Sequence, residues 1–156
     1  MKLVFFGTPE FAVPTLDALH NSEHEILGVV TSPDKKSGRG LNVSSSAIKK
    51  CSKNYSFPIY EPENTKCKQL HSTLKIINPD IYVVVAYKIL PESILRIPKK
   101  GAINLHASLL PKYRGAAPVN HAILNGDTEI GLSTFLIHKK VDTGDLLLQQ
   151  SMQIDN

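Results

Sequence analysis

The stretch Asp80-Ile81-Tyr82-Val83-Val84-Val85-Ala86 contains the chain's densest run of β-branched residues. Such a run is typical of a central strand that helices cover on both faces. The segment Tyr87 to Leu90 follows at once and is expected to cap the carboxyl end of this strand. Ligands of open α/β sheets bind beyond the carboxyl ends of the strands, so the cap is a candidate pocket wall.

Apolar strands and amphipathic helices alternate on both sides of this run. We expect strands at residues 3–6, 25–31, 57–60 and 102–106, and helices ending near 21 and spanning 47–54, 65–77, 91–97 and 118–125. Two strands, 130–137 and 146–149, then follow one another, and residues 32–46 are expected to form a long loop. The pattern predicts an α/β fold, with a doubly wound, Rossmann-like, mostly parallel sheet and a mixed edge.

The composition of the 156 residues, 42% of them hydrophobic, suits one domain. No run approaches the roughly 18 apolar residues of a membrane span, and Met1-Lys2 leads directly into an apolar strand. We therefore expect a cytoplasmic protein without membrane contact. We also expect a monomer. Cys51 and Cys67 are spaced for neither a disulfide framework nor a metal site, and we expect no metal. The net charge of +4 permits a nucleic-acid partner without requiring one.

Polar side chains gather where the expected strand 102–106 ends. With Ala102, Ile103 and Leu105 on the buried side, Asn104 and His106 project together from the other face, because residues two apart in a strand point the same way. An isolated Asn-x-His of this kind is more often a paired core histidine than a functional one. The residues that follow, Ser108 to Pro118, shift the balance toward an active-site loop.

Several motifs occur together and in order: Gly7-Thr8-Pro9-Glu10-Phe11, Gly38-Arg39-Gly40, Ile89-Leu90-Pro91, Asn104 to Pro118 (NLHASLLPKYRGAAP) and Asp142-Thr143-Gly144-Asp145. In combination they resemble the folate-dependent formyltransferases, and within that family the branch that acts on methionyl-tRNA. The resemblance covers residues 1 to about 150. It implies an enzyme that transfers a formyl group from 10-formyltetrahydrofolate, a reduced folate, to the α-amino group of initiator methionyl-tRNA in translation initiation.

The resemblance also implies roles for individual residues. Catalysis is assigned to Asn104, which stabilises the developing oxyanion, to His106, which transfers protons, and to Asp142, which orients the imidazole. Asp142 taken alone reads as an ordinary turn aspartate, and Arg114 as either a phosphate contact or a loop anchor. The folate is expected to contact Tyr87, Ile89, Leu90, Ser108, Leu109, Leu110 and Pro111, and the tRNA to contact Lys35, Lys36 and Arg39.

Two departures from the family pattern keep other readings open. The resemblance implies a basic C-terminal β-barrel that binds tRNA, so we expect residues 1–156 to correspond to an N-terminal catalytic domain that is incomplete and lacks this barrel. The segment Ala86-Tyr87-Lys88-Ile89 is one residue shorter than usual and has no glycine. The alternatives are a formyltransferase acting on a small amine, such as an amino-sugar nucleotide or glycinamide ribonucleotide, and a non-catalytic folate- or nucleotide-binding remnant.

Overall fold

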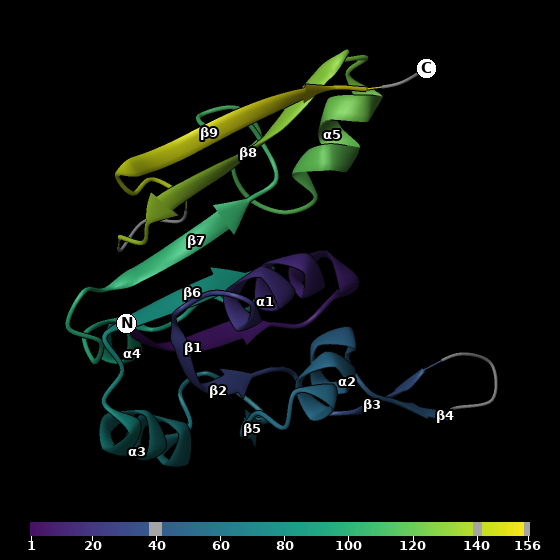
Figure 1. Ribbon diagram of the computed structural model, residues 1–156. Coiled ribbons are helices and arrows are strands. Elements are labelled where there is room, and N and C mark those ends of the chain that lie inside the picture. Colours follow the sequence, from purple (N-terminus) through teal and green to yellow (C-terminus); the bar gives the residue numbers. More distant parts are fainter. Residues whose placement is uncertain (38–41, 139–141, 155–156) are drawn as a thin grey trace. The chain divides into compact units, whose positions relative to one another are not determined.

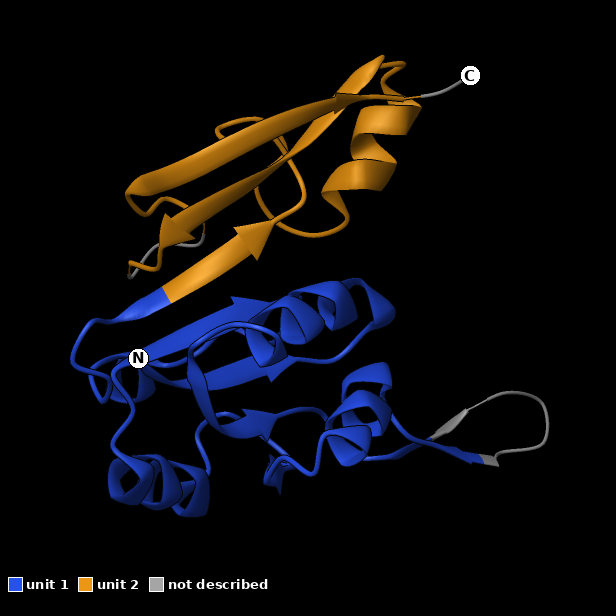
Figure 2. Cartoon of the chain, viewed as in Figure 1, with its two compact units in different colours: residues 1–102 blue, residues 103–156 orange. Residues whose placement is uncertain are grey.

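The computed structural model describes residues 1–37, 42–138 and 142–154 of the chain. It divides into two compact units, residues 1–102 and residues 103–156, coloured separately in Figure 2. Each unit is described by itself below.

Unit 1 contains four parallel strands in the hydrogen-bonded order β5-β2-β1-β6 (Figure 1). The strands are β1 (Lys2–Gly7), β2 (Glu25–Val30), β5 (Ile59–Tyr60) and β6 (Ile81–Val85). Strand β6 is the β-branched run from which the fold was predicted, and it pairs in register with β1 from Leu3↔Ile81 to Gly7↔Val85. Nearly every side chain of both strands is buried, as expected for strands covered on both faces.

The helices of unit 1 connect these strands. They are the 3-10 turn η1 (Glu10–Ala12) and the helices α1 (Val13–His20), α2 (Ala47–Asn54), α3 (Lys68–Ile77) and α4 (Glu92–Leu95). Leu16 of α1, Ile48 of α2 and Leu74 of α3 are fully buried, so each of these helices turns an apolar face toward the core. The prediction for 47–54 matches the structure. The helices predicted at 65–77 and 91–97 are shorter, because a turn occupies the first residues of 65–77 and a turn and a bend occupy the last residues of 91–97.

The prediction of a structureless loop at 32–46 is wrong in part. Strands β3 (Lys35–Ser37) and β4 (Asn42–Ser44) form a small antiparallel hairpin there. Its base is fixed by Lys49, whose ammonium group lies 2.8 Å from Asp34 and 2.9 Å from Glu61. The hydroxyl of Ser46 caps α2 by accepting from the Lys49 N–H and also contacts the Thr31 hydroxyl at 2.8 Å.

Unit 2 is an antiparallel sheet in the order β7-β8-β9 with one helix. Strand β7 (Ala102–His106) starts at the last residue of unit 1 and is followed by α5 (Pro118–Leu124), β8 (Glu129–Leu136) and β9 (Leu146–Gln153). These antiparallel strands, after the parallel strands of unit 1, agree with the predicted mixed edge. Strand β9 runs four residues beyond the predicted end at Gln149, because its polar second half still pairs with β8 as far as Glu129↔Gln153.

Cys51 and Cys67 are free thiols. No helix in the described part of the chain is long and apolar enough to cross a membrane. The single domain expected over residues 1–156 stays a prediction.

Candidate active site

Strand β7 carries Ala102, Asn104 and His106 on one face, since side chains alternate along a strand. The expectation that Ala102 shares a buried face with Ile103 and Leu105 is therefore wrong. Ala102 and His106 are the buried residues, and the three between them are half-buried. No described residue hydrogen-bonds to the Asn104 side-chain amide, so its N–H donors are available to a ligand.

His106 is 7% exposed and sits between two oxygen acceptors. Its Nε2 lies 2.8 Å from the carbonyl oxygen of Tyr113, and its Nδ1 lies 3.9 Å from Asp142 Oδ2. A carbonyl oxygen can only accept, so Nε2 carries a hydrogen. The neutral ring has one N–H and uses it on Tyr113, whereas the protonated ring has a second N–H for the carboxylate. The arrangement therefore suits a histidine that takes up and releases a proton at Nδ1.

Asp142 is held by two consecutive residues of the loop that follows β7. The Gly115 N–H donates to Asp142 Oδ2 at 2.8 Å, and Arg114 Nε donates to the Asp142 carbonyl oxygen at 2.8 Å. Asp142 adopts the left-handed conformation, with φ of 50°, which aspartate tolerates better than most residues. Gly144 lets this turn lie against β8, because a Cβ there would collide with the Leu136 carbonyl.

Tyr113, whose carbonyl faces His106, is fixed through its own hydroxyl. That hydroxyl donates to Asp127 Oδ2 at 2.9 Å and accepts from Asn125 Nδ2 at 3.0 Å. Tyr113 is also left-handed, with φ of 54°. Non-glycine residues hold such conformations where surrounding contacts enforce them, often at functional sites.

The predicted folate loop, Ser108 to Pro111, is bonded to strands β8 and β9 through Ser133. The buried Ser133 hydroxyl donates to the Ser108 carbonyl at 2.6 Å and accepts from the Leu110 N–H at 3.1 Å and from Gln149 Nε2 at 2.9 Å. One donor and two acceptors are all that a hydroxyl offers, so Ser133 is fully used. Gln149 Nε2 also donates to the Leu110 carbonyl, and the Leu110–Pro111 peptide is cis.

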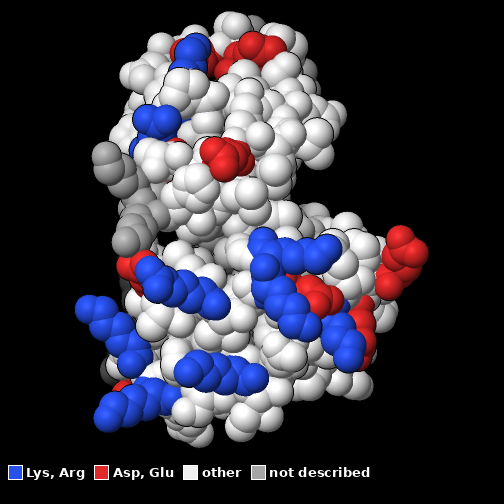
Figure 3. Space-filling model, turned by 90° about the vertical axis from the view of Figure 1, so that its left-hand side faces the viewer, with Lys and Arg blue, Asp and Glu red and all other residues white. Residues whose placement is uncertain are grey.

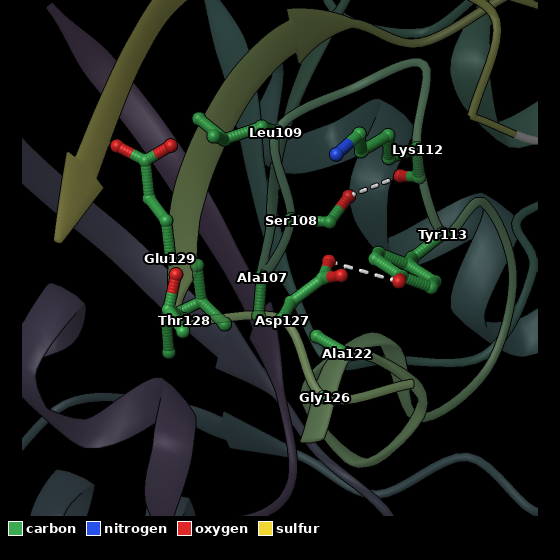
Figure 4. A pocket seen from close by; sticks show the side chains of 11 residues that line it. Ala107, Ser108, Leu109, Lys112, Tyr113, Ala122, Gly126, Asp127, Thr128 and Glu129 are labelled. Carbon is green, nitrogen blue, oxygen red and sulfur yellow. Dashed lines mark hydrogen bonds between the residues drawn. The ribbon is translucent and has the colours of Figure 1, made fainter. Parts of the chain in front are cut away.

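The same loop borders a cavity of about 340 Å³ within unit 2 (Figure 4). Leu109 packs over Gly131 of β8, where a Cβ would meet the leucine side chain at 2.5 Å. In Figure 4 the Tyr113 hydroxyl faces Asp127 across one wall, and Ser108 is bonded to the Lys112 carbonyl. The remaining walls come from Ala122 of α5 and from residues 126–130.

The other three predicted folate contacts, Tyr87, Ile89 and Leu90, lie in unit 1 after β6. Ile89 is 74% exposed, Leu90 is buried, and the Tyr87 ring packs edge-on against Phe6 at 5.5 Å between centroids. The Tyr87 hydroxyl is buried and has no hydrogen-bond partner among the described residues. Burial raises the pKa of Tyr87 to about 12, so the phenol remains a hydrogen-bond donor at neutral pH. An orphaned buried donor is a position where a ligand acceptor fits.

Two of the predicted tRNA contacts, Lys35 and Lys36, lie in β3 of the β3–β4 hairpin. Lys35 is exposed, and the Lys36 backbone pairs with Val43. Arg39 lies outside the described residues. The hairpin belongs to unit 1, which is rich in positive charge: residues 1–102 hold fourteen Lys and Arg against nine Asp and Glu, a net +5. Figure 3 shows Lys and Arg side chains gathered on the side of unit 1 that faces left in Figure 1, away from the hairpin, which extends to the right there.

Three residues of the site were not anticipated: the Tyr113 carbonyl, Ser133 and Gln149. Ser133 carries a weak sequence signal, because it is a hydroxyl on the inward-facing positions of β8, between Gly131 and Phe135. The Tyr113 and Gln149 contacts depend on loop conformation, which has no periodicity to read. Within residues 1–37, 42–138 and 142–154, no group of three or more His, Cys, Asp or Glu side chains is arranged to hold a metal ion.

Comparison with known proteins identifies the family of the chain. The family model described as "Formyl transferase" matches residues 1–156. The chain belongs to the formyl transferase family. A methionyl-tRNA formyltransferase from Caldanaerobacter subterraneus subsp. tengcongensis is 51% identical over 99% of the chain, and one from Thermodesulfovibrio yellowstonii is 51% identical over 99%.

This formyl transferase chain spans about half the length of the curated relatives it matches, 51% and 50% respectively. Among solved structures, glycinamide ribonucleotide transformylase 1 from Symbiobacterium toebii superposes with a TM-score of 0.83, at 14% identity, over 100% of this chain and 74% of that one. A similarity at this level of identity shows the fold, and it confirms the predicted α/β class.

Proposed function

We propose that this chain forms the catalytic part of an enzyme that moves the formyl group of 10-formyltetrahydrofolate onto the α-amino group of initiator methionyl-tRNA. Two relatives named methionyl-tRNA formyltransferase, each 51% identical to the chain, support the choice of substrate. The observation that carries the proposal is the His106–Asp142 pair, with Asn104 two residues before His106 on the same strand.

The reaction needs a neutral amine, a stabilised oxyanion and a path for one proton. The amine nitrogen forms a bond to the formyl carbon, the bond from that carbon to N10 breaks, and the proton lost by the amine is returned to N10. His106 serves as the proton carrier, because its ring gains a second N–H that Asp142 accepts. Asp142 stabilises the imidazolium, and no side-chain nucleophile is required because the amine itself attacks.

Asn104 supplies the oxyanion donor. It lies two residues before His106 on the same face of β7, and its amide N–H groups are not used by other described residues. A donor aimed at an oxygen that gains charge is worth roughly 3 kcal/mol of transition-state stabilisation in acyl transfer. Asn104 therefore stabilises the developing negative charge, and His106 transfers the proton.

The formyl donor supplies an activated one-carbon group, and the chain supplies its binding surface. Leu109 and Leu110 are half-buried apolar side chains on a loop that Ser133 and Gln149 hold in place. In unit 1 the unpaired Tyr87 hydroxyl offers a hydrogen bond. Taken separately, the apolar loop suits the flat ring of a reduced folate, and the Tyr87 hydroxyl suits an acceptor atom of such a ligand.

A transfer assay tests the proposal. The chain is fused to the part of the Caldanaerobacter relative that lies outside the match, and formyl transfer from 10-formyltetrahydrofolate is measured with methionyl-tRNA, glycinamide ribonucleotide and an amino-sugar nucleotide as acceptors. We expect transfer to methionyl-tRNA. Transfer exclusively to glycinamide ribonucleotide or the amino-sugar nucleotide would mean that the acceptor is a small amine and not methionyl-tRNA. Binding of the formyl donor without any transfer would favour a non-catalytic folate-binding remnant.

A further inference from the structure

Both members of the His106–Asp142 pair are held by one segment of three residues, Tyr113-Arg114-Gly115. Tyr113 contacts the histidine through its carbonyl oxygen. Arg114 and Gly115 contact the aspartate, one at its backbone and one at its carboxylate. The segment therefore sets the position of the carboxylate relative to the ring.

The Arg114 contact is directional. Its Nε–H donates to the Asp142 carbonyl at 2.8 Å, at a residue whose left-handed backbone needs support from its surroundings. Next to it, the Gly115 N–H reaches Asp142 Oδ2, the same oxygen that lies 3.9 Å from His106 Nδ1. Gly115 has φ of 94°, which side chains rarely adopt, so this N–H is aimed by a glycine-specific backbone.

The Tyr113 contact is anchored from the other side. The phenol is fixed by Asp127 and Asn125, just after α5, and the same residue's carbonyl receives the His106 Nε2–H. The hydroxyl thus acts on the histidine through the backbone of its own residue. Loss of the Arg114 contact would release Asp142, and loss of the Tyr113 hydroxyl contacts would release His106. Both catalytic side chains would still be present in either variant.

We propose that Arg114 and Tyr113 are positioning residues for the His106–Asp142 pair, Arg114 acting on the carboxylate and Tyr113 on the imidazole. The catalytic consequence rests on the proposed formyl transfer. The structural consequence, a fixed ring with Nε2 bonded to Tyr113 and Nδ1 facing Asp142, does not depend on that function.

The structural consequence is tested on the 156-residue chain by ¹⁵N NMR of its imidazole rings, with His106 assigned by its absence from the His106→Ala spectrum. The variants are Arg114→Ala, Arg114→Lys and Tyr113→Phe. The control is Arg96→Ala, which removes the same charge from an exposed arginine paired with Glu92 on α4. We expect the His106 nitrogen shifts to move in the three variants and to stay at wild-type values in the control, with unchanged far-ultraviolet circular dichroism throughout.

Arg114→Lys separates positioning from charge. Lysine keeps the charge but lacks the planar guanidinium that directs Nε–H at the Asp142 carbonyl, so we expect it to behave like Arg114→Ala. Full restoration of the wild-type His106 spectrum by lysine would overturn the directional role of Arg114. A His106 spectrum equal to wild type in folded Arg114→Ala and Tyr113→Phe would overturn the proposal as a whole.

The catalytic consequence is tested in the fused enzyme described above. Misplacement of a reacting group by about 1 Å can cost as much as 100-fold, so we expect kcat to fall roughly 10- to 100-fold in Arg114→Ala with the KM for the formyl donor nearly unchanged. A rise in KM with unchanged kcat would contradict positioning. If the wild-type fusion transfers no formyl group, the proposed function fails, and the NMR result still decides whether the segment positions the pair.

Discussion

At the residue scale, the site depends on how donors and acceptors match around two side chains. His106 faces the Tyr113 carbonyl and the Asp142 carboxylate, so its second N–H has a partner when the ring is protonated. The pairing of His106 with Asp142 was expected from the resemblance to the formyltransferases, because Asp142 taken alone reads as an ordinary turn aspartate. The resemblance did not predict that a backbone carbonyl seven residues after the histidine would fix its ring.

One prediction concerns the coupling of His106 and Asp142. Asp142→Asn keeps the size of the side chain but removes the charge that stabilises the imidazolium, so turnover should fall while donor affinity holds. Because the two groups act as one unit, the double variant His106→Ala/Asp142→Asn should be little slower than His106→Ala alone. Turnover of all three variants in the fused enzyme measures this. Fully additive losses would assign Asp142 to the fold or to the folate instead.

A second prediction concerns the buried phenol of Tyr87. Tyr87→Phe removes a donor that has no partner among the described residues, so it should raise the free energy of unfolding slightly and weaken binding of 5-formyltetrahydrofolate by about tenfold. Because burial raises the pKa of Tyr87 to about 12, the hydroxyl keeps its proton and the loss should be equal at pH 7 and pH 9.

Tyr82→Phe is the control for this experiment. Its hydroxyl is likewise buried and unpaired among the described residues, but it lies within β6 instead of after it. Calorimetric titration should show wild-type folate affinity for Tyr82→Phe. Equal affinity of wild type and Tyr87→Phe would remove Tyr87 from the folate site.

At the scale of elements, the predictable features were those with strong periodicity. The β-branched strand β6 and the amphipathic helix α2 were found with bounds within one residue of the observed ones. The β3–β4 hairpin was missed because its strands of three residues carry lysine, serine and asparagine, which leave no apolar alternation to read. The second half of β9 was missed for a related reason, since Gln150, Ser151 and Gln153 pair with β8 through their backbones.

The contacts between elements give a third prediction, at Ser133. Ser133→Ala deprives the Ser108 carbonyl and the Leu110 N–H of a common partner within a buried region, which should lower the free energy of unfolding by about 1–3 kcal/mol. It should also weaken folate binding, because the Ser108–Pro111 loop loses its attachment to β8. Ser151→Ala, at an exposed position of β9, is the matched control and should change neither quantity. Urea denaturation with wild-type stability for Ser133→Ala would refute the role of this hydroxyl.

At the scale of the whole molecule, charge is distributed unevenly between the two units. Residues 1–102 carry a net +5, whereas residues 103–156 have four Lys and Arg against five Asp and Glu, a net −1. A phosphate backbone is therefore expected to contact unit 1. The composition gives the total charge of the chain. How that charge is distributed between the two units could be stated only after the structure had defined their boundary.

A fourth prediction follows for tRNA. If Lys35, Lys36 and Arg39 each neutralise one phosphate, affinity should fall about 20- to 40-fold between 50 and 200 mM salt, and replacing all three with alanine should reduce that dependence strongly. Alanine at the exposed Lys66, Lys68 and Lys75 removes the same charge from the same unit and should have the smaller effect. Equal effects of the two triple variants in a filter-binding titration would mean that the hairpin has no special role.

The most direct test of the account is turnover of the fused His106→Ala enzyme with saturating 10-formyltetrahydrofolate and methionyl-tRNA. His106 is the group assigned to move the proton, and loss of a general acid or base typically costs about 10²- to 10⁴-fold. We predict a loss in that range, with folding and folate affinity close to wild type. Near-normal turnover in the folded variant would contradict this prediction.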